Sequence, residues 1–217
     1  MLKLQSVCSD VAGINVLRNV TGEVHAGSLT AVIGRNGAGK TTLLRTIMGA
    51  VEIKHGTIHV DGELINHLKA YERSHIGIGW APEERVIFPT MSVKENMMFP
   101  CQIVGHNKGQ VQDRIDMVLD VVPQLKAMLD RSGAALSGGQ GKMVALGRAL
   151  MVGTRIVLLD EPFQGLSPAL AREYGESLSN LRNSQPDIAI IVTESNAALL
   201  HGIADQTFNI ERGEITN

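Results

Sequence analysis

The most informative segment of the sequence is Leu29-Thr30-Ala31-Val32-Ile33-Gly34-Arg35-Asn36-Gly37-Ala38-Gly39-Lys40-Thr41-Thr42. A short apolar run typical of a buried strand leads into a glycine-rich turn, and the spacing of residues 41–48 predicts a helix after the turn. The turn fits the pattern G-x-x-x-x-G-K-[ST] between a strand and a helix, which is the context that this phosphate-binding motif requires. We therefore expect a strand–loop–helix unit that holds the phosphates of a nucleotide.

The composition of this turn has a physical reason. Glycines let consecutive backbone N–H groups curve around phosphate oxygens, and the helix that starts near Lys40 points the positive end of its dipole at them. Lys40 can neutralise the β- and γ-phosphates, and the Thr41 hydroxyl can bind the Mg²⁺ ion that accompanies them. The predicted phosphate-binding residues are Gly34, Arg35, Asn36, Gly37, Ala38, Gly39, Lys40, Thr41 and Thr42.

A second motif joins an apolar run, Ile156–Leu159, to two carboxylates, Asp160 and Glu161. A buried strand that ends in this way can direct Asp160 toward hydrated Mg²⁺ and leave Glu161 to polarise an attacking water. On spacing alone, a solvated pair of acidic loop residues is an equally good interpretation. The phosphate-binding motif upstream favours the first interpretation, with Asp160 as a metal ligand and Glu161 as the general base.

The rest of the sequence predicts an α/β architecture. Short alternating runs within about the first 75 residues, with the turn signal Asp61-Gly62 between two of them, predict an antiparallel β layer. Residues 93–129 have helical spacing, and the alternation of strands and helices that returns after Ala134 predicts a parallel sheet. We expect one domain over residues 1–217, with a helical subdomain at 90–135 inserted in the α/β core.

Length and composition exclude several classes of protein. The chain has 217 residues, of which 44% are hydrophobic and 19% charged, and this balance is typical of globular rather than disordered or collagen-like chains. The formal net charge of −2 provides no bulk positive field for phosphates of nucleic acid, so we expect no nucleic acid partner. The most apolar runs are about five residues long, against the roughly 20 that a membrane-spanning helix needs. Any association with a membrane is therefore expected to go through a partner.

A third motif, Leu136-Ser137-Gly138-Gly139-Gln140, combines a serine with two glycines at the start of an expected helix. The free N–H groups of such a helix start can bind an anion, and the plainer interpretation is an ordinary serine N-cap. Leu136 lies 24 positions before Asp160. With these three motifs in this order, essentially the whole chain resembles the ATP-binding subunits of ABC transporters.

The resemblance implies a P-loop NTPase fold of ABC type, in which a parallel core sheet carries an antiparallel β layer and an inserted helical subdomain. It also implies that the chain binds ATP and Mg²⁺ and hydrolyses the ATP. In this family two ATP-binding subunits pack head to tail, so that the third motif of one contacts the γ-phosphate of ATP held by the other. ATP then bridges the two subunits, and its hydrolysis opens them and moves attached membrane subunits. The residues that would make the contact across the dimer are Ser137, Gly138, Gly139 and Gln140.

Four positions depart from the usual pattern of the family. Glu83 stands where glutamine is usual before the helical subdomain, and its carboxylate can still bind Mg²⁺. Ser195 stands at the position of the switch histidine and cannot supply an imidazole to the γ-phosphate. Ser167 replaces an aspartate, and the position near Val11 lacks the aromatic residue that stacks on adenine. The residues that the resemblance places at the catalytic positions are Glu161 and Ser195, and those at the metal site are Thr41, Glu83 and Asp160.

Three segments favour one branch of the family. They are the pair Pro82-Glu83, the sequence Glu194-Ser195-Asn196 at the position of the usual histidine-aspartate pair, and the run Glu161-Pro162-Phe163-Gln164-Gly165-Leu166-Ser167-Pro168. All three resemble the second ATP-binding subunit of branched-chain amino acid importers, or of the similar urea and amide importers. The implied partners are a second, different ATP-binding subunit, transmembrane permease subunits and, indirectly, an extracytoplasmic solute-binding protein. The implied location is the cytoplasmic face of the inner or plasma membrane, through the permease subunits.

Two other functions remain open at this point. A non-transport ABC ATPase acting on nucleic acid or ribosomes is disfavoured by the negative net charge and by the interval of only 96 residues between Lys40 and Leu136, which leaves no room for a long coiled coil. The second is an assembly module that uses its ATP site as a switch, with a degenerate catalytic site. The departures at Ser195 and Val11 keep that hypothesis open.

Overall fold

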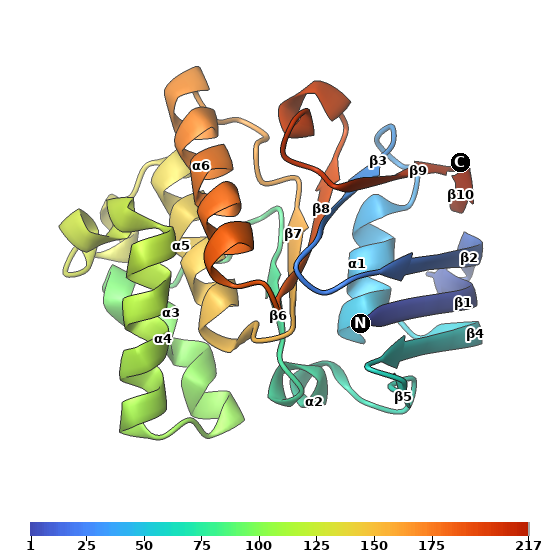
Figure 1. Ribbon diagram of the computed structural model, residues 1–217, viewed down its shortest axis with the longest axis horizontal. Helices are drawn as coiled ribbons and strands as arrows, with labels where there is room; N and C mark the ends of the chain where they lie inside the picture. The colour runs from blue at the N-terminus through green and yellow to red at the C-terminus, as the bar shows by residue number, and fades with distance from the viewer. Residues whose placement is uncertain (217) are drawn as a thin grey trace.

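The computed structural model describes residues 1–216, which form three layers (Figure 1). A central sheet separates a layer of helices from a second layer, in which helix α1 (Lys40–Met48) lies beside a small antiparallel sheet. The arrangement confirms the predicted α/β fold with an added antiparallel β layer.

The central sheet has six strands in the order β10-β9-β3-β8-β7-β6. Its strands are β3 (Leu29–Ile33), β6 (Ile78–Ala81), β7 (Ile156–Asp160), β8 (Ala189–Glu194), β9 (Gln206–Glu211) and β10 (Glu214–Thr216). Neighbouring strands are parallel, except that β9 and β10 are antiparallel. The carboxyl ends of β3, β6, β7 and β8 therefore meet along one edge, and ligands of open α/β sheets bind at such an edge.

The antiparallel layer has four strands in the order β2-β1-β4-β5. They are β1 (Leu2–Val11), β2 (Ile14–Val24), β4 (Ile53–Val60) and β5 (Glu63–Leu64). Strands β4 and β5 are joined by Asp61 and Gly62, which have φ angles of 52° and 85°. A two-residue hairpin turn of type I′ needs positive φ at both positions, so the structure confirms the predicted turn.

Helices cover the other face of the central sheet (Figure 1). They are α3 (Val93–Val104), α4 (Lys108–Val121), α5 (Gly138–Val152) and α6 (Pro168–Ser184), with 3₁₀ turns η1 (Pro123–Met128), η2 (Gly133–Ala135) and η3 (Ala197–Leu200), while the short α2 (Ala70–His75) precedes β6. The helical spacing over 93–129 is divided, because Gly105 ends α3 with φ of 73° and the Asn107 side chain caps α4. Among the helices of residues 1–216, none has the length and the apolar character needed to cross a membrane.

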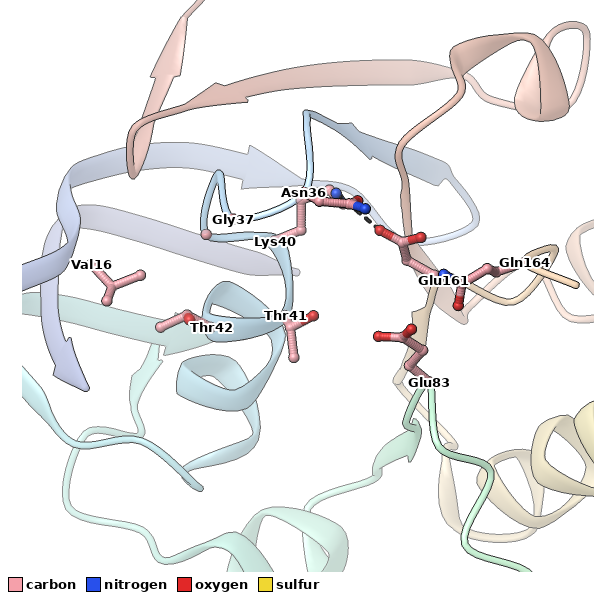
Figure 2. Close-up of a pocket in the computed structure, with 10 residues that line it drawn as sticks. Val16, Asn36, Gly37, Lys40, Thr41, Thr42, Glu83, Glu161 and Gln164 are labelled. Atoms are coloured by element: carbon pink, nitrogen blue, oxygen red, sulfur yellow. Dashed lines mark ion pairs between the residues drawn. The ribbon is translucent and has the colours of Figure 1, made fainter. Parts of the chain in front are cut away.

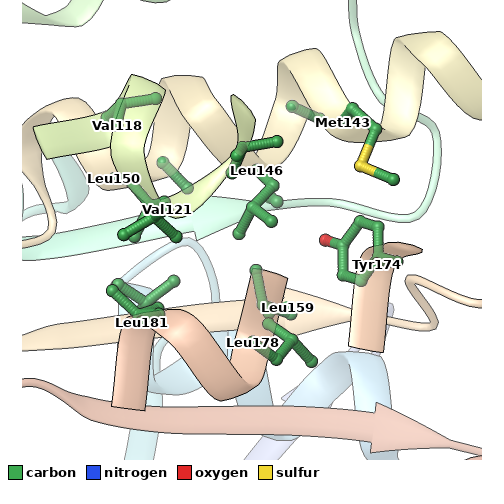
Figure 3. Close-up of a cluster of buried hydrophobic side chains, with 14 of the residues drawn as sticks. Val118, Val121, Met143, Leu146, Leu150, Leu159, Tyr174, Leu178 and Leu181 are labelled. Carbon is green, nitrogen blue, oxygen red and sulfur yellow. The ribbon is translucent and has the colours of Figure 1, made fainter. Parts of the chain in front are cut away.

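Two hydrophobic clusters fill the two faces of the central sheet. Strand β7 contributes to both, because Val157 and Leu159 point toward the helices while Ile156 and Leu158 point toward α1. Figure 3 shows the cluster on the helical side, where residues of α4, α5 and α6 meet β7. The helices between residues 93 and 129 therefore share one core with the sheet.

Candidate active site

A cavity of about 440 Å³ opens where strands β3, β6 and β7 end (Figure 2). It is lined by Val16, Asn36, Gly37, Gly39, Lys40, Thr41, Thr42, Glu83, Glu161 and Gln164. Figure 2 shows the phosphate-binding turn and α1 on one side of this space and the carboxylates of Glu83 and Glu161 on the other. The fold thus brings the glycine-rich turn and the acidic strand end into one site.

Glycines give the phosphate-binding turn its shape. Gly37 and Gly39 have φ angles of 80° and 112°, in a region that residues with side chains rarely adopt. Gly34 is needed for space, because a Cβ there would collide with the backbone oxygen of Ile210 on β9. The turn continues directly into α1, which begins at Lys40. The N–H groups of the first helical turn have no intrahelical partners, and they border the cavity.

Lys40 is buried at the centre of the site. Its Nζ donates hydrogen bonds to the backbone oxygens of Gly34, at 2.7 Å, and Arg35, at 3.2 Å. The same Nζ lies 2.9 Å from Glu161 Oε1, and the two side chains are only 4% and 9% exposed. Because unpaired buried charges are costly, Glu161 and Lys40 stabilise each other in this arrangement.

Asp160, at the end of β7, is 2% exposed. Its Oδ1 accepts hydrogen bonds from the hydroxyls of Thr41, at 3.1 Å, and Thr193, at 2.7 Å. Burial raises the pKa of this carboxyl, and the two hydroxyl donors oppose the rise. The second oxygen, Oδ2, is buried and has no hydrogen-bond partner among the described residues. An unpartnered buried oxygen indicates a place for an ion or a water.

The oxygen atoms around Thr41 fit Mg²⁺. Thr41 gives its hydroxyl proton to Asp160, so lone pairs of the hydroxyl oxygen remain for a cation. The carboxylate of Glu83 points into the same cavity (Figure 2). Within residues 1–216 no group of three or more His, Cys, Asp or Glu side chains is arranged to hold a metal. Because Mg²⁺ is commonly bound by one or two carboxylates together with substrate phosphates, the site suits an ion that arrives with a nucleotide.

Glu161 has an unusual backbone conformation, with φ of 42°. Its N–H donates to Thr193, whose Oγ1 lies at 3.0 Å and whose backbone oxygen lies at 3.2 Å. Strained conformations of this kind cluster at functional sites. Ser195 Oγ lies 2.8 Å from both Glu161 Oε1 and Asn36 Oδ1, and accepts a hydrogen bond from Lys40 at 3.0 Å. The serine at the switch position is therefore inside the site.

Two buried ionisable side chains hold the backbone around Glu161. Glu194, which is 2% exposed, accepts a hydrogen bond from the N–H of Phe163 at 3.0 Å. Burial raises the pKa of Glu194 to about 7, and the N–H of Phe163 opposes the rise. Lys142 donates a hydrogen bond to the backbone oxygen of Glu161, and burial lowers its pKa. The sequence motifs predict neither Glu194 nor Lys142 at the site.

Sequence reasoning also missed Val16 and Gln164 in the cavity lining. Val16 lies on β2, on the same side as Thr42 in Figure 2, and no motif marks that strand. Val11, the position expected to face adenine, is 41% exposed and is not among the lining residues. Gln164 could have been found, because it follows Glu161 by three positions in a motif already recognised.

The third motif lies outside this cavity, at the start of α5. The Oγ of Ser137 accepts a hydrogen bond from the N–H of Gln140 at 3.3 Å, and Oε1 of Gln140 accepts one from the N–H of Ser137 at 3.0 Å. This reciprocal pair is a capping box, which fixes the start of the helix.

Not every residue of the phosphate-binding turn lines the cavity around Lys40. Gly34, Arg35 and Ala38 line a neighbouring hollow beside β9 instead.

Comparison with known proteins identifies the family and agrees with the fold. Residues 17–164 match the sequence model of a family described as ABC transporter. The probable branched-chain amino acid transport ATP-binding protein LivF of Archaeoglobus fulgidus is 31% identical over 215 residues, which cover 99% of this chain and 90% of that protein. The high-affinity branched-chain amino acid transport ATP-binding protein BraG of Pseudomonas aeruginosa is 34% identical over 215 residues, which cover 99% of this chain and 91% of that protein.

Solved structures agree as well. The ADP conformation of MJ1267, an ATP-binding cassette of an ABC transporter, matches with a TM-score of 0.85 and 25% identity, over 100% of this chain and 89% of that one. The region matched by the family model contains all three motifs. These matches confirm the resemblance drawn from the motifs, and the chain belongs to the ABC transporter family of ATP-binding subunits, which makes it an ATPase.

Proposed function

We propose that the chain hydrolyses ATP to energise an importer of branched-chain amino acids, or of urea or amides. The observation that carries the proposal is the single cavity that combines the Lys40 amine, the Glu161 carboxylate and the oxygens of Thr41 and Glu83. These groups are a phosphate site at the start of α1, a base that follows β7, and metal ligands from α1 and from the loop after β6. Branched-chain amino acids are the solutes named for LivF and BraG, to which the whole chain is similar, and the urea or amide alternative comes from the resemblance in sequence.

In the proposed reaction, the ATP phosphates lie against the N–H groups of the turn and the amine of Lys40. Glu161 accepts a proton from water as the water oxygen forms a bond to the γ-phosphorus. The bond from the γ-phosphorus to the bridging oxygen breaks, which gives ADP and inorganic phosphate. Ser195 and the backbone bonds to Thr193 hold Glu161 in place during this step.

Thr41, Asp160 and Glu83 would hold Mg²⁺. When bound, the ion supplies positive charge that offsets the charge developing on the phosphate oxygens. Asp160 contributes its unpartnered Oδ2, and Thr193 keeps the carboxylate oriented through Oδ1. The binding of this ion is therefore expected to give Asp160 Oδ2 the partner that it lacks among residues 1–216.

A second ATP-binding subunit completes the site in this proposal. The start of α5, with Ser137 and Gly138 exposed, is free to contact ATP held by a partner. The N–H groups of a first helical turn suit a γ-phosphate. We propose a different chain as the partner, because Ser195 replaces the switch histidine and a second subunit can supply the missing group at its own site.

Transmembrane permease subunits and, indirectly, an extracytoplasmic solute-binding protein are the remaining proposed partners. The proposed location is the cytoplasmic face of the inner or plasma membrane, through the permease. Both proposals rest on the named roles of the relatives as transport ATP-binding proteins. We propose no nucleic acid partner, in keeping with the negative net charge of the chain.

We also propose that the chain is one ABC ATP-binding domain, with residues 90–135 as its inserted helical subdomain. The support is the cluster on the helical face of the sheet, in which Val93, Val118 and Leu125 pack with residues of β7 and α5. A segment that contributes to the core of its neighbour in this way is part of one packing unit.

The test is hydrolysis of Mg²⁺-ATP by the purified chain over a range of protein concentrations. Glu161→Gln is the control, because it removes the base and keeps the size and polarity of the side chain. We expect this variant to retain ATP binding and to lose at least about 100-fold in turnover. A specific activity that rises with concentration would mean that two identical chains can form working sites.

Other outcomes decide against the proposal. Full turnover by Glu161→Gln would remove Glu161 from the role of general base. Binding without turnover in the presence of permease and partner subunit would favour the alternative, an assembly module that uses ATP as a switch. The comparisons do not favour that alternative, since both relatives described above are transport proteins.

A further inference from the structure

The loop between β6 and α3 contains two consecutive residues in a rare backbone conformation. Arg85 and Val86 have φ angles of 65° and 45°. Left-handed backbone is uncommon for residues with side chains, and Val86 is also β-branched. The N–H of Val86 donates to the backbone oxygen of Glu84 at 2.7 Å, so Arg85 is the centre of a three-residue turn of a strained kind. The strain begins two residues after Glu83.

Arg148, on α5, holds this strained backbone. Its Nη1 donates to the backbone oxygen of Val86, and its Nη2 donates to that of Arg85 at 2.6 Å. The guanidinium carbon lies 6.0 Å from the ring centre of Phe88, in the same loop. A rigid guanidinium fork can bind two adjacent carbonyls at once, whereas a lysine ammonium is a single point of charge.

Other features fix the loop on both sides of residues 85 and 86. The fully buried side chain of Asn96 accepts a hydrogen bond from the N–H of Phe88 at 2.8 Å and donates one to its backbone oxygen at 3.0 Å. On the other side, Pro82 directly follows β6. Strained backbone persists only where surrounding contacts impose it, and Arg148 supplies two of those contacts to residues 85 and 86.

We propose that Arg148 is a positioning residue for metal-dependent nucleotide binding: it imposes the path of residues 85 and 86 and thereby directs the Glu83 carboxylate into the cavity. Arg148 is not among the cavity-lining residues, whereas Glu83 is. Its effect on a bound nucleotide must therefore pass through the loop and Glu83. The inference rests on the proposed function, because that function assigns Glu83 to the metal.

The experiment measures binding of a fluorescent ATP analogue to the full chain, first with EDTA and then along a Mg²⁺ titration. In Arg148→Met, binding with EDTA is expected to match that of the unmodified chain, because Glu83 contributes only through the metal. The Mg²⁺ concentration at the midpoint is expected to rise about tenfold, which is typical of residues that orient a metal ligand. Arg131→Met, at an exposed arginine, is the matched control and is expected to leave the midpoint unchanged.

A double-mutant cycle with Glu83→Ala, which removes the ligand oxygens of this side chain, separates positioning from a general structural role. If Arg148 acts through Glu83, the double variant needs no more Mg²⁺ than Glu83→Ala alone. Additive midpoint shifts, or weaker binding with EDTA, would overturn the inference. Arg148→Lys keeps the positive charge and loses the forked guanidinium, so we expect a smaller rise in the Mg²⁺ midpoint. This variant replaces Arg148→Met in the experiment if Arg148→Met fails to fold. An unmodified chain that binds no Mg²⁺-ATP would instead overturn the proposed function.

Discussion

Lys40 and Glu161 carry opposite charges and neutralise each other inside the site. The distance from Lys40 Nζ to Glu161 Oε1 is 2.9 Å. Removal of one member of a buried pair leaves the other charge unpaired, at a cost of about 3–5 kcal/mol. A non-polar substitution at either residue would therefore lower both the turnover and the stability, and the two effects could not be separated. Glu161→Gln is the informative change, since an amide oxygen can still accept a hydrogen bond from Lys40.

Glu194 leads to a prediction about pH. Burial raises its pKa from 4.5 to about 7, with Glu161 adding to the rise and Lys142 and Lys40 opposing it. The folded chain therefore keeps a proton that the unfolded chain releases near pH 4.5, and this stabilisation is lost as the pH rises through about 7. Glu194→Gln cannot titrate, and its amide oxygen can still accept the bond from Phe163.

We expect the free energy of unfolding of the unmodified chain to fall by about 2–3 kcal/mol between pH 5 and pH 8, relative to Glu194→Gln. Urea unfolding at a series of pH values measures this difference. Parallel stability curves for the two proteins would show that Glu194 keeps the same pKa in both states.

At the scale of elements, the sequence predicts helices and strands that have a local pattern. It does not predict those whose formation depends on packing against the rest of the chain. Strand β3 and helix α1 could be predicted because their motif dictates both residue type and spacing. Strand β6 could not: it has four residues and includes Gly79, which in sequence suggests a turn. Its place depends on α5, because a Cβ at Gly79 would collide with the backbone oxygen of Ala149.

The site residues also divide into those that a local pattern predicts and those that packing brings in. Lys40, Asp160 and Glu161 could be predicted because they belong to motifs with fixed residue types and fixed spacing. Val16 and Glu194 lie on ordinary strands, and they reach the site only when the two sheets and α1 have come together. Arg148 is hidden for another reason, since its partners are backbone carbonyls and any sequence could supply those.

Gly79→Ala tests the contact between β6 and α5. The added methyl group has no room against backbone, so we expect a loss of about 1–3 kcal/mol in the free energy of unfolding. The urea midpoint measures the change. Gly109→Ala on α4 is the control, because the nearest atom there is a side-chain oxygen of Asn107 at 3.3 Å and a small effect is expected. An unchanged midpoint in Gly79→Ala would contradict the close approach.

At the scale of the molecule, two hydrophobic clusters lie on opposite faces of one sheet and both depend on it. The helical-side cluster joins residues of α3, α4 and η1 to residues of β7 and β8. The other cluster joins β1, β2, β4 and α1 to the same strands. Since β7 supplies side chains to both, loss of either cluster exposes a face of the strand that carries Asp160.

Leu125→Ala tests whether the helical segment unfolds with the rest. Leu125 on η1 is fully buried, and its truncation is expected to lower the free energy of unfolding by about 2–4 kcal/mol. Trp80, the one tryptophan of the sequence, packs against the opposite cluster and reports on it by fluorescence. We expect fluorescence and far-ultraviolet circular dichroism to give the same midpoint.

A helical signal that is lost before the fluorescence changes would show that residues 90–135 unfold on their own. Ile103→Ala is the matched control, since Ile103 on α3 is 52% exposed and its truncation is expected to cost little.

The ion pair between Lys40 and Glu161 also affects the affinity of the site for a phosphate group. A phosphate group gains the full charge of Lys40 only in molecules whose ion pair is open, so the measured affinity is the intrinsic affinity reduced by the open fraction. A phosphate bound to Lys40 in turn favours the molecules in which Glu161 is released from the pair. Binding of the substrate and release of the general base are therefore coupled.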